Sequence, residues 1–214
     1  LIVFLGIVAV LETWGIKVGP VIAGLGLFGV AVALGAQDLF KNLISGILII
    51  LEKRFQLGDV IEVPGYAIGT VEDMGFRSTL IRQFDTTSVS LPNYVFSDSA
   101  ILNYSHRQYR RIKWIIGLTY DSSSEQLKDI CQKIEEYINN SPNFIVNEEY
   151  QLFVRVDKFS ESSIDLLIQA FTSTNDWSKY LSIKEDLAYS IKSIIQDNNG
   201  SFAFPSQSIY VEKK

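Results

Sequence analysis

The stretch VIAGLGLFGVAVALGAQ, residues Val21–Gln37, decides the fold of this chain. No charged residue lies between Lys17 and Asp38, which leaves an uncharged run of about 20 residues. As a helix this run is about 30 Å long, and that length matches the hydrocarbon thickness of a bilayer. The sequence therefore predicts a membrane-spanning helix at this position.

The predicted helix contains many small residues. Glycine costs about 1 kcal/mol relative to alanine inside a helix, so its repeated use indicates a place where backbones approach closely. The small residues form two faces at helical spacing, one with Gly26, Gly29 and Ala33 and another with Ala23, Leu27 and Ala31. Val30 and Leu34 form a third, narrow apolar stripe. We expect copies of this helix to pack together, with the stripe facing a central axis.

The pattern changes after Gln37. Polar residues appear at Asp38, Lys41, Asn42 and Ser45, while apolar residues recur at helical spacing up to Leu51. A kink formed by Gly35, Gln37 and Asp38 would let the first helix cross the membrane and this amphipathic segment lie near its surface. Residues 18–54 are therefore predicted to form one kinked helix.

The residues before this helix are interpreted as membrane-associated too. Leu1–Leu11 is apolar but too short to span a bilayer, and it lacks the basic region and cleavage site of a signal peptide. We expect residues 1–17 to be the end of a membrane helix followed by a turn, with Trp14 at the interface. More basic residues follow the predicted span than precede it, which places the C-terminal region in the cytoplasm.

The rest of the chain has an α+β pattern in two parts. Residues 55–104 read as a β module, with strands at Asp59–Val63, Gly69–Met74, Phe76–Phe84 and Thr87–Leu91. Residues 105–205 read as strand, helix, strand, strand, helix, strand, which is the ferredoxin-like order. The strands of this second part are expected at Ile112–Thr119, Leu152–Phe159, Ser163–Thr172 and near Ser201–Phe204.

The two helices of the second part carry their own boundary signals. The first is predicted to begin at a capping box formed by Ser122 and Glu125. The second is predicted over Trp177–Asp197 and stops at Asn198-Asn199-Gly200. Gln207–Val211 remains as one further strand within residues 206–214.

Composition argues against catalysis. The chain has one histidine, His106, and one cysteine, Cys131, so no zinc-binding spacing or Ser-His-Asp set is expected, and no cofactor. We interpret Cys131 as a buried, inert thiol. The net charge of −5 disfavours nucleic acid as a partner. The basic run Arg107–Lys113 is interpreted as an inter-domain salt-bridge surface in preference to a site for anionic lipid or nucleic acid.

Five stretches together resemble one known family. They are VIAGLGLFGVAVALGAQDLFKNLISG, RFQLGDVIEV, IGTVEDMGFRSTLIR, LPNYVF and FAFPSQSIYV, in the family's order and spacing. The family is that of the small-conductance mechanosensitive channels, and the FAFPSQ and RFQLGD motifs are most similar to its low-conductance branch. The resemblance implies an Sm-like fold for residues 55–104, a ferredoxin-like fold for 105–205 and a β-barrel strand within 206–214.

The resemblance also implies a function. It implies a homoheptamer in the cell inner membrane, multi-pass, with membrane lipid and permeant ions as partners. Val30 and Leu34 correspond to the two apolar rings that narrow the family's pore, and such rings exclude ions because a narrow apolar pore expels water. Membrane tension would open this pore and release ions and small osmolytes on hypo-osmotic shock.

Three positions depart from the family pattern. Val30 is smaller than the usual leucine, and Leu27 stands where a small residue is usual. Asp38 stands where glycine is common. Asp38 either forms a carboxylate ring at the inner pore mouth or N-caps a helix that begins at Leu39, and we favour the cap.

Two other functional classes stay open. One is a secondary transporter, although the spanning run has no ionisable residue for coupling. The other is a membrane-tethered scaffold whose β module binds RNA or protein, although an acidic chain disfavours RNA. Stretch-activated single-channel currents are expected only of a channel.

Overall fold

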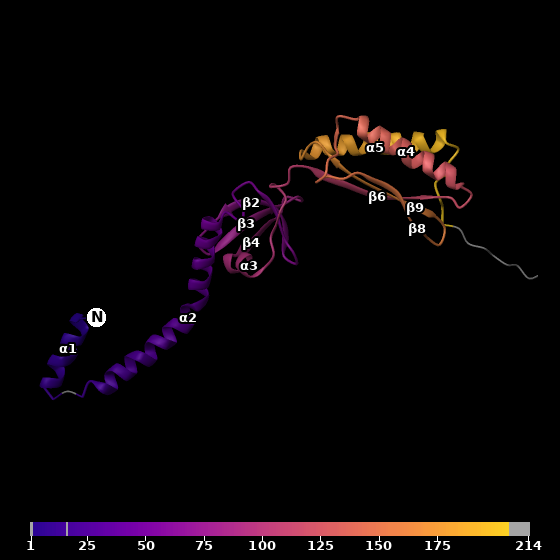
Figure 1. The fold of residues 1–214 in the computed structure, drawn as a ribbon. Helices are drawn as coiled ribbons and strands as arrows, with labels where there is room; N and C mark the ends of the chain where they lie inside the picture. The colour runs from indigo at the N-terminus through magenta and orange to yellow at the C-terminus, as the bar shows by residue number, and fades with distance from the viewer. Residues whose placement is uncertain (1, 16, 206–214) are drawn as a thin grey trace, which may run out of the picture. The chain divides into compact units, whose positions relative to one another are not determined.

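The computed structural model describes residues 2–15 and 17–205, which divide into two compact units, Leu1–His106 and Arg107–Lys214. Each unit contains its own apolar core. Figure 1 shows the helices and strands of each unit along the chain. The predicted barrel strand at Gln207–Val211 lies outside the described residues.

Two helices begin the first unit, α1 at Ile2–Thr13 and α2 at Gly19–Glu52. Proline lies in the first turn of α2, where its missing N–H costs nothing, and Lys53 ends the helix in the left-handed conformation. Both predicted segments, the apolar span and the amphipathic part, belong to this one helix. The ribbon of α2 changes direction partway along its length (Figure 1), while the helix assignment continues through Gly35–Asp38.

The helix α2 has the properties of a membrane span. Among the described residues it is the one helix long and apolar enough to cross a bilayer, with a mean hydropathy of 1.9 over its most apolar window. None of that window is buried by the rest of its own chain. Within residues 2–15 and 17–205, the apolar surface of this window is therefore left exposed.

The remainder of the first unit is an antiparallel sheet, hereafter the β-module. Its elements are β1 Val60–Val63, β2 Ala67–Met74, β3 Ser78–Gln83, β4 Ser88–Pro92, α3 Asn93–Asp98 and β5 Leu102–Asn103. The strand order is β4-β3-β2-β1-β5. Alternate residues of β1, β2 and β3 point into a core that also contains Phe55 and Phe96. The four predicted strands are confirmed, whereas α3 and β5 had not been predicted.

The second unit is a four-stranded antiparallel sheet with two helices. Its elements are β6 Arg110–Leu118, α4 Ser124–Asn140, β7 Phe144–Ile145, β8 Phe153–Phe159, β9 Ile164–Thr172 and α5 Trp177–Asp197. The strand β9 pairs with β6, β7 and β8. The two helices lie side by side over one face of the sheet (Figure 1). Their apolar stripes meet the inward side chains of the sheet in one core.

Three predictions for the second unit can be compared with the structure. The helix predicted at Trp177–Asp197 is confirmed. The capping box predicted at Ser122 was wrong by one residue, because the Ser123 side chain accepts from the Gln126 backbone N–H and Gln126 reciprocates. The strand predicted near Ser201–Phe204 is reduced to a single bridge between Leu118 and Phe202.

Candidate pore helix and its junction with the β-module

The predicted pore stripe is exposed in the single chain. The side chains of Val30 and Leu34 lie on α2 with 56% and 67% of their surface accessible. The predicted packing residues are exposed as well: Ala23, Gly26, Gly29, Ala31 and Ala33. A Cβ atom added to Gly26 or Gly29 would meet nothing within 4 Å. The chain by itself thus brings none of these residues into contact, and an oligomer is needed to test their roles.

The second half of α2 is buried on an unexpected face. The buried residues are Asn42, Ser45, Gly46 and Ile49, which repeat at helical spacing and pack on the β-module. The apolar side chains of the same segment, such as Phe40 and Ile47, are exposed. A soluble amphipathic helix would bury its apolar face. Here a face that is mostly polar or small makes the tertiary contact, and most of the apolar face is exposed.

Asn42 joins α2 to the short helix α3. Its Nδ2 donates to the carbonyl oxygen of Asp38 at 2.9 Å, and its Oδ1 accepts from the backbone N–H of Tyr94 at 3.2 Å. Tyr94 lies in the first turn of α3, where backbone N–H groups have no partner inside the helix. Pro92, the residue that precedes α3, gives no side-chain cap. Asn42 therefore caps α3 from a different helix.

A buried asparagine fixes the other side of this junction. Asn93 is only 1% exposed, and its Nδ2 donates to the carbonyl oxygens of Gly75 and Phe76 at 2.9 and 3.0 Å. Its Oδ1 accepts from the Thr79 hydroxyl at 3.0 Å. A Cβ on Gly46 would lie 2.6 Å from the Asn93 Nδ2, so only glycine fits at this crossing.

An ion pair lies at the rim of the junction. Lys41 Nζ is 2.7 Å from Asp98 Oδ2 and lies 4.5 Å from the centre of the Tyr94 ring. Both charged side chains are about half exposed, so solvent screens the pair and it contributes little to stability. Its main effect is to hold the Lys41 ammonium against α3.

Asp38 is placed differently from the favoured interpretation. It lies well inside α2, whereas an N-cap residue has non-helical backbone geometry at the start of a helix. The proposed cap is therefore wrong for this conformation. The reason is that α2 continues without a break, so no free helix start exists at Leu39. The carboxylate-ring interpretation and the kink at Gly35, Gln37 and Asp38 stay predictions.

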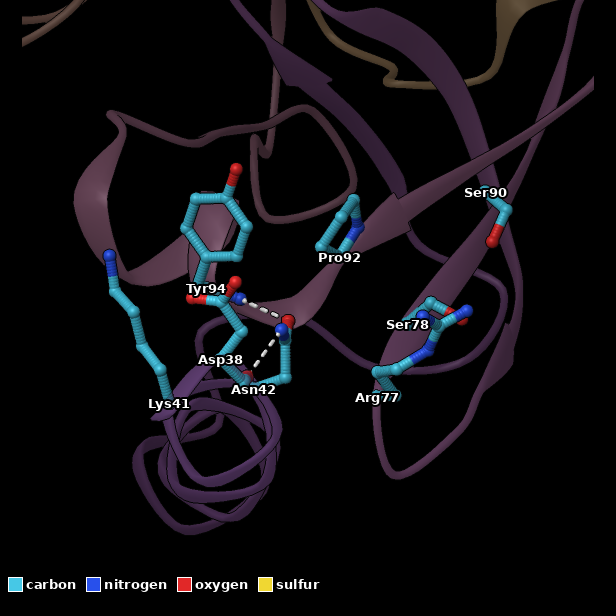
Figure 2. Close-up of a pocket in the computed structure, with 8 residues that line it drawn as sticks. All are labelled: Asp38, Lys41, Asn42, Arg77, Ser78, Ser90, Pro92 and Tyr94. Carbon is cyan, nitrogen blue, oxygen red and sulfur yellow. Dashed lines mark hydrogen bonds between the residues drawn. The ribbon is translucent and has the colours of Figure 1, made fainter. Parts of the chain in front are cut away.

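A polar pocket of about 500 Å³ adjoins the junction. It is lined by Asp38, Lys41, Asn42, Arg77, Ser78, Ser90, Pro92 and Tyr94. Figure 2 shows Asp38 on the α2 side and Arg77 on the β-module side, with the Asn42 hydrogen bonds next to Asp38. Sequence reasoning missed Arg77, Ser78, Ser90 and Tyr94. Arg77 was placed inside the strand predicted at Phe76–Phe84, whereas in the structure β3 begins at Ser78 and Arg77 lies in the loop before it.

The single cysteine and the single histidine take no part in the contacts of this junction. Cys131 is half-buried on α4, and burial, with a further contribution from Glu135, raises the pKa of its thiol. The thiol is therefore protonated at neutral pH and a weak nucleophile. His106 is mostly exposed and lies 3.8 Å from Asp59. Within residues 2–15 and 17–205, no three His, Cys, Asp or Glu side chains are grouped to hold a metal ion.

Known families match nearly the whole chain in three consecutive parts. Residues 1–37 match the family "Mechanosensitive ion channel, transmembrane helices 2/3". Residues 38–106 match "Mechanosensitive ion channel, beta-domain", and residues 112–202 match "Mechanosensitive ion channel MscS, C-terminal".

Individual relatives agree with these matches. An uncharacterized MscS family protein of Aquifex aeolicus is 38% identical over 96% of this chain and 55% of its own length. The low conductance mechanosensitive channel YnaI of Escherichia coli is 32% identical over 94% of this chain and 58% of its own. The chain thus spans about half the length of such curated relatives.

Solved structures have the same fold. The closed-state crystal structure of Helicobacter pylori MscS is 27% identical, with a TM-score of 0.78 over 95% of this chain and 78% of that one. Arabidopsis thaliana MSL1, at 24% identity, matches with a TM-score of 0.82 over 94% of this chain and 72% of that one, which shows the fold alone. The family resemblance predicted from the sequence is confirmed: the chain belongs to the small-conductance mechanosensitive channel family.

Proposed function

We propose that this chain forms the pore helix and the cytoplasmic vestibule of an ion channel opened by membrane tension. The observation that carries the proposal is the exposed stripe of Val30 and Leu34 on a membrane-length helix whose apolar window is not buried by its own chain. Such a stripe needs partners, and copies of the same helix provide them. The channel is a homo-oligomer, with seven subunits by family resemblance.

In the closed state, Val30 and Leu34 of all subunits form apolar rings around the axis. A narrow apolar constriction expels water, and an ion that enters it loses its hydration shell at a large cost in free energy. The rings therefore block ions without a plug. No catalytic residue and no cofactor take part.

In the open state, the spanning halves of α2 tilt and separate. Tension favours the state with the larger area in the membrane plane, and the free energy supplied equals the tension multiplied by the area difference. The constriction then hydrates, and ions and small osmolytes pass after hypo-osmotic shock. The junction at Asn42, Gly46 and Asn93 connects this motion to the β-module.

The remaining assignments complete the proposal. The β-module is Sm-like, and the second unit is ferredoxin-like. The domain boundaries follow residues 17, 54, 104 and 205. The protein crosses the cell inner membrane more than once, with membrane lipid around it and its C-terminal region in the cytoplasm.

Patch-clamp recording of the full-length protein tests the function. Graded suction on membrane patches should produce single-channel steps whose open probability rises with tension. A transporter or a scaffold gives no such steps. Patches that contain the protein yet stay silent up to the lytic tension would refute the proposal.

Replacing Gly29 with leucine should make the channel harder to open. Gly29 lies with Gly26 and Ala33 on one face of α2, where close backbone approach leaves no room for a large side chain. Overpacking of about 1–3 kcal/mol predicts a fall of about tenfold in open probability at fixed tension. Val32→Leu, which enlarges an exposed side chain on neither small face, is the control. Equal tension thresholds in wild type and Gly29→Leu would argue against a helix interface at this face.

A further inference from the structure

We propose that Asp38 and Arg77 form an ion pair in the conducting state and thereby hold α2 against the β2–β3 loop across the pocket between them. The inference rests on the proposed tension-gated function. It assigns a role to a carboxylate and a guanidinium that the structure brings to opposite walls of one pocket (Figure 2).

The position of Asp38 on α2 is the first argument. Asn42, Gly46 and Ile49 follow Asp38 at helical spacing, and all three are buried against the β-module. Asp38 is exposed and lies one turn before this contact begins. If the spanning half of α2 leans toward the β-module, Asp38 is the next side chain of that face to meet it.

The opposite wall of the pocket carries the cation Arg77 on a loop whose backbone is held by hydrogen bonds. The carbonyl oxygen of Arg77 accepts from the Asn93 backbone N–H at 2.9 Å, and the Gly75 backbone N–H donates to Ser78 at 2.9 Å. Phe76 is held through its carbonyl by the Asn93 side chain. The loop backbone is thus tied to the junction, while the Arg77 side chain is exposed and can rotate.

Both charges are available for pairing. Within the part of the chain that the structure describes, neither the Asp38 carboxylate nor the Arg77 guanidinium forms an ion pair or a side-chain hydrogen bond. Lys41 is the competing cation near Asp38, but its ammonium is already bound to Asp98 and the Tyr94 ring. The Arg77 guanidinium, whose planar fork matches a carboxylate, is the remaining partner in the pocket.

The pair would act as a state-dependent contact. A contact that is absent in one conformation and formed in another stabilises the second by its own free energy. The charges are apart in the conformation described, so their pairing favours the leaning state of α2. A partly exposed pair shifts an equilibrium by about twofold, and these factors multiply over the subunits.

Charge neutralisation and charge exchange test the pair. The variants are Asp38→Asn, Arg77→Gln, the double variant, and the exchange Asp38→Arg with Arg77→Asp, each recorded by patch clamp. Each single variant should raise the tension of half-opening, the double variant should raise it no further, and the exchange should return it toward wild type. Glu72→Gln with Arg82→Gln is the matched control, since that pair is already formed on the same sheet at 2.7 Å. Additive single effects, or an exchange without recovery, would overturn the proposal.

Cross-linking gives a readout independent of current. Asp38→Cys and Arg77→Cys are combined in a Cys131→Ser background, which removes the only other cysteine. A disulfide requires Cα atoms within about 7 Å, so mild oxidant should cross-link the pair in cells under hypo-osmotic shock and much less in unshocked cells. Equal cross-linking in both conditions, or none, contradicts the pair. Wild-type patches without tension-activated steps would instead refute the proposed function, and the cross-link yield would still decide whether the residues meet.

Discussion

Leu34→Ser should leave the proposed channel conducting without applied tension. The Leu34 side chain is 67% exposed in the single chain, and in the proposed channel it belongs to an apolar ring formed by copies of α2. A ring of serine hydroxyls hydrates, because each hydroxyl offers water a hydrogen-bond donor and acceptor. A hydrated constriction no longer imposes the desolvation cost that excludes ions. The expected result is a standing current in unstretched patches and slow growth of cells that express the variant.

The matched control is Leu25→Ser. Leu25 is on the same helix with 55% of its surface exposed, but it lies about two and a half turns before Leu34 and so on the opposite side. The same loss of apolar surface there should leave the closed channel silent. If Leu34→Ser is equally silent without tension, Leu34 is not part of the gate.

Gly46→Ala should have the second largest effect, through the junction between α2 and the β-module. The new Cβ would lie 2.6 Å from the Asn93 Nδ2 and 3.2 Å from the Phe76 carbonyl oxygen. Asn93 has little freedom to move away, because it is buried and donates to two backbone carbonyls. Overpacking costs about 1–3 kcal/mol, which exceeds the gain of about 1 kcal/mol that alanine brings to a helix.

Two measurements check this prediction. The thermal unfolding midpoint of the purified protein should fall, and the tension dependence of opening should change, because α2 no longer seats on the β-module. Gly6→Ala on α1 is the control, since a Cβ there meets nothing within 4 Å of its own chain and the residue belongs to neither small face of α2. An unfolding midpoint for Gly46→Ala at or above that of wild type would show that the junction relaxes without cost.

The helices and strands could be predicted from the sequence where a local pattern of residues determines them. The uncharged run before Asp38 predicted the long apolar helix, and β-rich composition between turn residues predicted the strands of the β-module. The capping box shows where local spacing fails. Ser122 and Ser123 each precede an acceptable partner by three residues, so the pattern alone does not choose between them.

The site was less predictable because its contacts join distant segments. The pocket residues Asp38 and Arg77 come from a helix and from a loop between two strands, and no periodicity links them. The burial of Asn42 could not be predicted from the sequence for a related reason. A polar residue on an amphipathic helix is expected to face water. Asn42 is buried because it accepts from the Tyr94 backbone N–H, which has no partner within its own helix α3.

The hydrogen bond from the Tyr94 backbone N–H to Asn42 also lets hydrogen exchange at Tyr94 report on the contact between α2 and the β-module. Most backbone N–H groups of the β-module donate within its own sheet or helix, and they exchange with solvent deuterium only when that element opens. The Tyr94 N–H donates instead to a side chain of α2. Its deuterium uptake therefore follows the docking of α2 alone, and the ratio of its exchange rate to that of a β3 amide measures undocking separately from unfolding.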